Sequence, residues 1–523
     1  MTNKLMRGLA PVLAISLALG LTACGSNTAE TKAAGGETVA QAEAKGDSTA
    51  ATKDTLVIAT ANETPSMTTN LHNATAGDYM NKMTHNGLFL LDENMEVQPD
   101  LVESYETVSD TEWVFKLRQG VKFHNGAEMK AVDVKASLEQ AKESPEVAQY
   151  GRSYVSIEIV DDYTIKIITD GPQASLLNDL TSHGNFILPV DLIESGHDFN
   201  KEPIGTGPYK FVEWNKGESV VFEAFEDYFK GEPAIKNVTW KIIPEGSSRT
   251  LALEAGEVDM IIEVETTDVS RLKDNSAIAV FDEASTGYNY MMINNEVAPF
   301  DNINFRRAIA SAIDKNAIIQ VALNGGGSPV DALVPDCFPG ATAEGAPTYD
   351  PEQAKAYFAE SGLNAADCGF ALICSDDTKL RAGQVIQSCL KETLGVEITL
   401  ESMDLATYLD VTATGDYQAA LGGYTTDTMM SFAKGVFHSN AINSSNKTRI
   451  NVPEVDAIID KMLTTVDTEE NNAIVTEFSN MMNEMCPQVP LYFKNNTRAY
   501  NANLDGFTCG ASGGTFYDRL SWK

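Results

Sequence analysis

The sequence predicts an α/β protein with two or three domains. About 470 residues follow the first 53, more than one hydrophobic core usually serves. A strand, a helix and a strand are indicated in turn over 238–261, with Gly256 placed where a helix C-terminus favours positive φ. Apolar residues at 305, 308, 309, 312 and 313 then mark one face of a further helix. Such β-α-β alternation is typical of α/β lobes.

The other elements follow from local periodicity. Short apolar or alternating runs predict strands at 56–59, 113–117, 121–124, 157–168 (around a turn at 161–162), 211–214, 396–400 and 489–492. Asn125-Gly126 is a strong turn pair. Helices are expected at 133–142, 247–255, 380–394, 457–462 and 473–482, and Asp314 can cap a helix that carries Ile318 and Ile319. The methionines near 481–485 are expected to fill the core.

A glycine-rich turn at 204–209 deserves comparison with a phosphate-binding loop. No Gly-Lys-Ser/Thr follows the turn, and Pro208 removes an N–H group that such a loop would use. We interpret it as a backbone turn.

The N-terminus predicts export and lipid anchoring. Lys4 and Arg7 precede an apolar run at 9–21, which is too short to span a membrane. Leu-Thr-Ala-Cys at 21–24 resembles the bacterial lipobox, in which the cysteine becomes the first residue and carries the lipid, including palmitate. The alternative is an ordinary signal peptide with an incidental cysteine. We expect a signal peptide at 1–23, lipidation of Cys24, and a tether at 24–53 that is too poor in apolar residues to fold.

The charge balance restricts the possible partners. The chain has 38 basic and 74 acidic residues, a net charge of -36. Nucleic acid is therefore excluded as a partner, because phosphate binding needs a basic surface. Solubility accounts for the acidity, and a preference for cationic ligands is possible but does not follow from bulk charge alone.

Cysteine and histidine usage agrees with an exported protein without a metal. Six cysteines besides Cys24 suggest disulfides, with 15 possible pairings that the sequence leaves open. These cysteines are Cys337, Cys368, Cys374, Cys389, Cys486 and Cys509. None pairs with a histidine at metal-ligand spacing, so we expect neither a structural metal nor a cofactor.

The motifs of common hydrolases are absent. The sequence contains no Gly-x-Ser-x-Gly and no His-Glu-x-x-His, and nothing places two carboxylates around a bond to be cleaved. We therefore expect a protein that is not an enzyme.

Several sequence blocks form a specific series along the chain. One of them is Pro-Ile-Gly-Thr-Gly-Pro-Tyr at 203–209 and another is Leu-Glu-Ala-Gly-Glu-Val-Asp at 253–259. Together with the blocks at 99–105, 113–126, 305–315 and 489–492, they resemble family 5 of the bacterial extracellular solute-binding proteins, in the order of that family. The resemblance implies a two-lobed, periplasmic-binding-protein type of α/β fold (cluster C) with an extra subdomain inserted in lobe I.

The resemblance also implies a domain organisation. Lobe I would combine 54–91, 205–290 and 491–523, the inserted subdomain would be 92–204, and lobe II would be 291–490. The chain would cross between the lobes near Tyr288 and Leu491, which makes these two places hinge candidates. Ligand would lie between the lobes and be enclosed when they close.

Candidate ligand-binding residues follow from the same resemblance. Peptide-binding members anchor the peptide's α-amine with an aspartate, and the run 421–427 matches its usual context. Asp427 is therefore the expected amine anchor, and Tyr424 and Gly423 are expected to line the cleft with it. The Asp-Pro that commonly follows is missing, so Asp427 could instead be a helix N-cap or an exposed loop carboxylate. Met67 occupies the segment that reaches the cleft from lobe I, although the common Leu-Asp-Pro is absent there.

The resemblance finally implies a function and its partners. We expect a monomeric substrate-binding lipoprotein of an ABC importer, held by its lipid at the extracytoplasmic face of the cell membrane. It would capture di- or oligopeptides and deliver them to a permease and ATPase complex. The alternatives are a nickel chelate or another small solute in the same fold, or a non-transport role as a receptor or chaperone at the cell surface. The nickel members' cleft arginine and histidine have no evident counterparts.

Overall fold

The structure is a computed structural model that describes residues 53–523. The predicted signal peptide, Cys24 and nearly all of the predicted tether lie outside these residues. The described residues 53–523 belong to one compact unit. Over the described part, no helix has both the length and the apolar character needed to cross a membrane.

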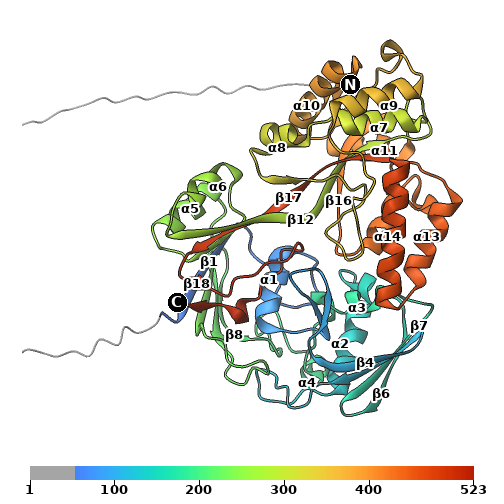
Figure 1. Cartoon of the computed structure of the whole chain (residues 1–523). Coiled ribbons are helices and arrows are strands. Elements are labelled where there is room, and N and C mark those ends of the chain that lie inside the picture. Colours follow the sequence, from blue (N-terminus) through green and yellow to red (C-terminus); the bar gives the residue numbers. More distant parts are fainter. Residues whose placement is uncertain (1–52) are drawn as a thin grey trace, which may run out of the picture. The chain divides into compact units, whose positions relative to one another are not determined.

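One large sheet organises the fold. Its strands lie in the order β15-β14-β16-β12-β17-β11-β1-β10-β9-β8, and β13 pairs with β17. Two long antiparallel strands, β12 (Ile278–Ile293) and β17 (Gln488–Asn501), run side by side through its middle (Figure 1). We call the part beside β11 lobe I and the part beside β16 lobe II. The protein is thus an α/β protein of two lobes that share two crossing strands.

The lobe I sheet is covered on both faces. Its strands are β1 (Thr55–Thr60), β8 (Tyr209–Asn215), β9 (Ser219–Ala224), β10 (Asn237–Ile242) and β11 (Met260–Ile262). Side chains alternate along β1, so Leu56 and Ile58 pack on one face while Ala59 packs on the other. Helix α1 (Thr75–Thr84) contributes to the first core, and α5 (Gly246–Glu254) and α6 (Thr266–Lys273) to the second. The predicted helix at 247–255 is thereby confirmed, and Gly256 follows it with φ +73°.

A separate four-stranded sheet lies between β1 and β8 in the sequence. Its order is β4-β5-β7-β6, it has its own apolar core, and it appears with α2 below lobe I in Figure 1. The elements of this region are β2 (Phe89–Leu91), β3 (Val97–Pro99), β4 (Val102–Ser109), β5 (Glu112–Leu117), α2 (Ala131–Glu143), β6 (Tyr154–Asp161), β7 (Thr164–Thr169), α3 (Leu176–Asp179) and α4 (Val190–Ser195). The strand predicted at 121–124 is wrong. Val121 and Phe123 are buried as the alternation requires, but the only ladder pairing there is an isolated bridge between Lys122 and Glu128.

The glycine turn at 204–209 holds α1 in place. A Cβ added to Gly205 would lie 2.3 Å from the carbonyl oxygen of Thr84, and one added to Gly207 would lie 2.4 Å from the backbone nitrogen of His85. The turn also donates a hydrogen bond from Gly207 N–H to the Thr84 carbonyl at 3.0 Å. Both glycines are therefore required by close backbone packing against the end of α1.

Lobe II combines short strands with most of the helices. Its strands are β13 (Gly327–Pro329), β14 (Ala371–Cys374), β15 (Thr399–Ser402) and β16 (Ala419–Thr425). Its helices are α7 (Ile303–Ala312), α8 (Lys315–Leu323), α9 (Pro351–Ser361), α10 (Asp377–Leu394), α11 (Leu405–Thr414), α12 (Met429–Val436), α13 (Pro453–Thr464) and α14 (Thr468–Met485). Asp314 caps α8 as predicted, with its carboxylate accepting from Ala317 N–H at 3.0 Å. Met482 is fully buried, and Met481 and Met485 pack against the same core.

Short elements complete the chain. The C-terminal segment forms β18 (Leu504–Asp505) and β19 (Ser521–Trp522), and five 3₁₀ turns are present in the described part. These are η1 (Ala148–Tyr150), η2 (His183–Asn185), η3 (Ala365–Asp367), η4 (Ser439–Ala441) and η5 (Tyr517–Arg519).

The expected disulfides are not formed. All six cysteines of the described part are free thiols. Burial raises the pKa of Cys337 to about 12 and those of Cys374 and Cys486 to about 11. The six thiols lie in different segments of the fold, and the four buried ones (Cys368, Cys374, Cys486 and Cys509) pack as small apolar groups.

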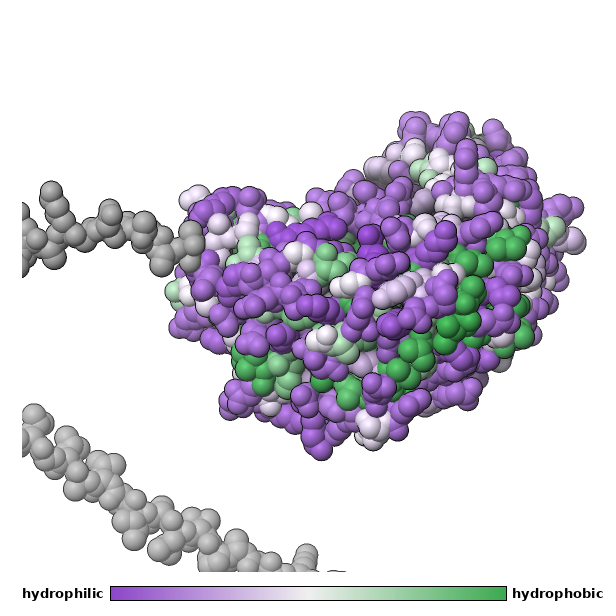
Figure 2. All heavy atoms as spheres, turned by 90° about the horizontal axis from the view of Figure 1, so that it is seen from below, coloured by the Kyte–Doolittle hydropathy of each residue, from purple (hydrophilic) through white to green (hydrophobic). Residues whose placement is uncertain are grey.

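The surface is predominantly hydrophilic, as the charge balance requires. Seen from below, a hydrophobic band interrupts it on the side where the four-stranded sheet lies (Figure 2). The exposed apolar residues of β6 include Val155, Ile159 and Val160.

Candidate functional site

Two adjoining cavities lie between the lobes. Their volumes are about 340 Å³ and about 560 Å³, within the range of small-molecule sites. Both are lined by Thr75 of α1, Thr286 of β12, Thr425 of β16 and Ser512 of the C-terminal segment. Because Thr75 belongs to lobe I and Thr425 to lobe II, the two cavities form one cleft between the lobes.

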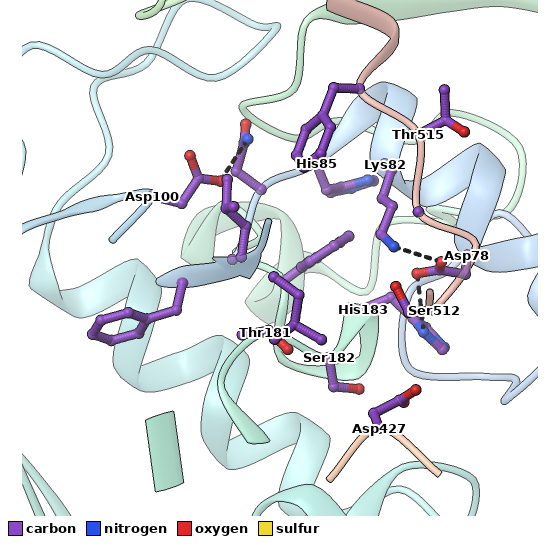
Figure 3. A pocket seen from close by; sticks show the side chains of 18 of the residues that line it. Asp78, Lys82, His85, Asp100, Thr181, Ser182, His183, Asp427, Ser512 and Thr515 are labelled. Carbon is purple, nitrogen blue, oxygen red and sulfur yellow. Dashed lines mark hydrogen bonds and ion pairs between the residues drawn. The ribbon is translucent and has the colours of Figure 1, made fainter. Parts of the chain in front are cut away.

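The smaller cavity has a charged network on its lobe I wall. Asp78 and Lys82 lie one turn apart on α1, with Lys82 Nζ 2.8 Å from Asp78 Oδ2. The other oxygen, Oδ1, lies 3.6 Å from Nδ1 of His183 (Figure 3). Burial alone would raise the pKa of Asp78, but Lys82 and His183 outweigh it and the pKa is lowered. The Asp78–Lys82 pair is therefore charged and mutually neutralising at neutral pH.

A second histidine supports this network. The rings of His72 and His183 stack with their centroids 4.7 Å apart, and His183 Nε2 lies 3.1 Å from the carbonyl oxygen of His72. His72 in turn bonds Asn81 of α1 at 2.8 Å. The wall is thus built from α1, the segment just before it, and the distant 3₁₀ turn η2.

Asp427 faces this wall from lobe II. It lies in the loop between β16 and α12, its side chain is exposed in the cleft, and it lines the smaller cavity. Its carboxylate forms no hydrogen bond or ion pair with a described residue. The N-cap of α12 is Thr428, whose side chain accepts from Ser431 N–H at 3.1 Å, so Asp427 does not cap the helix. The surrounding protein partly desolvates Asp427 and raises its pKa, against the opposing charge of Lys82.

The far end of the smaller cavity holds a second ion pair. Asp100 is 3% exposed; its Oδ1 lies 2.5 Å from Lys230 Nζ, and its Oδ2 accepts from Asn86 at 2.9 Å. Asp518 lines the same end, and burial raises its pKa although Lys230 acts against this. His85 is 1% exposed, and its Nε2 has no hydrogen-bond partner among the described residues. Burial lowers the pKa of His85 to about 3, so its ring is neutral at physiological pH.

The larger cavity is basic. Its lining includes Arg381 of α10 together with Lys494 and Arg498 of β17, against the single carboxylate of Glu263. None of the three cations forms an ion pair with a described residue. Arg498 is 2% exposed and donates to Tyr79 Oη at 3.1 Å, but its Nε has no partner in the described part. This cavity can therefore accept an anionic group.

The predicted site residues are not all in the cleft. Asp427 lines it, but Tyr424, Gly423 and Met67 line neither cavity. Tyr424 packs its ring edge-on against Phe432 of α12 at 5.7 Å. Gly423 lies beside β12, where an added Cβ would be 2.9 Å from Oδ1 of Asn289. Met67 is 1% exposed and belongs to the lobe I core.

Sequence reasoning missed most of the cleft residues. The spacing of Asp78 and Lys82 is a helix ion-pair signal, but it is too common to mark a site. No local pattern groups the three cations of the larger cavity. Arg381 lies more than 100 residues before Lys494 and Arg498, which belong to the long strand β17.

Comparisons with known proteins identify the family. The sequence profile of the "Bacterial extracellular solute-binding proteins, family 5 Middle" matches residues 96–444. The chain is 27% identical to the glutathione-binding protein GsiB of Salmonella typhimurium over 469 residues, which cover 86% of this chain and 91% of that protein.

Two solved structures show the fold in different states. The unliganded open form of MppA, a periplasmic murein tripeptide binding protein, superposes with a TM-score of 0.82 at 21% identity, covering 90% of this chain and 97% of that chain. The periplasmic binding protein DppA of Helicobacter pylori, in complex with the peptide STSA, gives 0.65 at 23% identity, covering 90% and 98%. This protein therefore belongs to family 5 of the bacterial extracellular solute-binding proteins, which are the non-enzymatic, solute-binding components of ABC importers.

Proposed function

We propose that the cleft captures peptides, with the α-ammonium group toward Asp427 and the carboxylate toward Arg381 and Lys494. The observation that carries this proposal is the opposite charge of two cavities that share walls. The smaller one offers carboxylates without an ion pair, Asp427 among them, and the larger one offers cations without an ion pair among the described residues. A zwitterionic chain that spans both would pair each of its ends, which neither a sugar nor a simple cation can do.

Closure of the lobes would strengthen both contacts. Asp427 is exposed in this structure, so water screens its charge. Enclosure of the ligand removes this water, and the same ion pair then contributes more. The higher TM-score with an unliganded open form than with a peptide complex supports the interpretation that the cleft is open here.

The hinge is proposed to lie where β12 and β17 cross between the lobes. Their pairing is interrupted between Ala284, which pairs with Asn495, and Tyr288, which pairs with Phe493. An interruption in a ladder leaves fewer hydrogen bonds to resist a change of φ and ψ. The hinge candidates near Tyr288 and Leu491 adjoin this point.

The first test is native mass spectrometry of the protein purified without denaturant, followed by calorimetric titration with di- to pentapeptides. A retained mass that fragments into amino acids, or micromolar or tighter binding of peptides, is the expected result. Glutathione, the ligand named for the relative GsiB, is included because it too has an ammonium group and carboxylates. If the protein binds no peptide but binds a nickel chelate or a sugar, the proposal is wrong.

We also propose that Cys24 carries lipid and holds the protein at the extracytoplasmic face of the membrane. Lys53, at the end of the predicted tether, pairs with Asp259 and lies 4.2 Å from the ring centroid of Trp522, so lobe I fixes the point where the tether arrives. Labelled palmitate should be incorporated into the wild-type protein and not into Cys24→Ala. Equal labelling of both proteins would refute this assignment.

A further inference from the structure

We propose that the cleft selects peptides with a basic side chain, which would lie at the far end of the smaller cavity against Asp518. This inference rests on the proposed function and adds the substrate class. It places two cationic groups in one cavity, the α-ammonium at Asp427 and a lysine- or arginine-like group at Asp518.

The charges that line the smaller cavity do not balance. Two ammonium groups face five carboxylates, and the pairs Lys82–Asp78 and Lys230–Asp100 are each satisfied within the protein. The fifth carboxylate, Asp92, accepts hydrogen bonds from Asn94 N–H, Glu96 N–H and Gln98 in its own turn. Two carboxylates are left, those of Asp427 and Asp518. Neither has an ion pair with any residue from 53 to 523.

These two carboxylates need two separate cations. Asp518 lies at the end of the cavity where Lys230 and Asp100 meet, since the charges of both act on its carboxyl group. Figure 3 shows Asp100 and Asp427 on opposite sides of the cavity. An α-ammonium bound at Asp427 therefore cannot also neutralise Asp518.

The surroundings also favour a cation over an anion. His85 lines the cavity and is buried and neutral, so it supplies no positive charge to an anionic ligand. The Nε2 atom of this cavity-lining residue has no hydrogen-bond partner among the described residues. A carboxylate side chain placed here would meet Asp518 and Asp100 with only Lys230 to offset them, which a binding site avoids.

The test compares peptides that differ in one charge. Tripeptides of alanine with lysine at the first, second or third position are titrated calorimetrically beside counterparts with norleucine or glutamate at the same position, and beside glutathione. Norleucine keeps the apolar stem of lysine without its ammonium group. At one position, lysine is expected to bind about tenfold or more tightly than norleucine, because a hydrogen bond to a charged group is worth about 1.5–3 kcal/mol.

Two variants locate the effect. Asp518→Asn should abolish the lysine preference at that position while leaving the norleucine peptide unchanged. Asp505→Asn removes the same charge from an exposed position on β18 that lines neither cavity, and it should keep the preference. Circular dichroism and thermal melting of both variants confirm the fold.

The outcomes separate the two proposals. If peptides bind but lysine, norleucine and glutamate bind equally, or if Asp518→Asn retains the lysine preference, this inference is overturned and peptide capture stands. If no peptide binds and glutathione does not either, the proposed function itself fails.

Discussion

Asp427→Asn tests the proposed amine anchor most directly. The substitution keeps the size of the side chain and one accepting oxygen, and it replaces the other oxygen and the negative charge with a neutral NH2 group. In the open cleft, a unit charge 4 Å from an ammonium group gains only about 1 kcal/mol in bulk water. After closure, a charge-assisted hydrogen bond contributes about 1.5–3 kcal/mol, so the variant should bind peptides about 10- to 150-fold more weakly.

The assay is calorimetric titration with a peptide that the wild-type protein binds. Asp410→Asn is the matched control, because Asp410 is exposed on α11 of the same lobe and lines neither cavity. A control variant that binds like wild type rules out a general effect of net charge. A peptide with an acetylated N-terminus should bind wild type and Asp427→Asn equally. A loss of less than threefold in Asp427→Asn would refute the amine anchor.

Four further predictions follow from the same structure. Arg381→Met should weaken peptides with a free C-terminal carboxylate about tenfold or more by calorimetry, and should leave C-terminally amidated peptides unaffected. The pKa of Asp427 is raised in the empty cleft, and a bound ammonium group favours the ionised form of its carboxyl group. Peptide affinity, measured by calorimetry, should therefore be full above that pKa and fall as the pH is lowered through it. Asp427→Asn should remove this pH dependence, and a wild-type affinity that does not change with pH would contradict the prediction. Gly207→Ala should lower the melting temperature by forcing α1 away from the turn, at a cost of about 1–3 kcal/mol, whereas Gly171→Ala, where an added Cβ meets nothing within 4 Å, should not. Ellman's reagent should detect six thiols in the denatured mature body and react slowly with the native one; fewer thiols without reductant would mean that disulfides form after all.

Local sequence signals predicted the elements well where local physics decides them. Residues close together in the sequence define the apolar faces of α7 and α10 and the cap of α8. The structure has helices at all three places. The prediction at 121–124 failed because alternation reports burial, while a strand also needs a neighbour to pair with along its length. That neighbour is supplied by the rest of the fold.

The cleft could not be predicted in the same way. Asp427 was found through its sequence context, but its relation to Lys82 depends on how two lobes face each other. Arg381 and Arg498 belong to different elements that only the crossing of β12 and β17 brings to one cavity. Tyr424 has the right position in sequence for a cleft wall, yet the alternation of β16 and contact with Phe432 direct its ring toward α12.

The α/β character, the family and the excess of acidic over basic residues follow from the amino-acid sequence alone. These properties depend on residue composition or on patterns within a short stretch of sequence, so they can be read without knowing the fold. Which carboxylates are neutralised by a lysine, and which face the cleft unpaired, depends on the three-dimensional fold. A charge has a partner only within a few ångströms, and residues such as Asp100 and Lys230, 130 positions apart in the sequence, reach that distance only after folding.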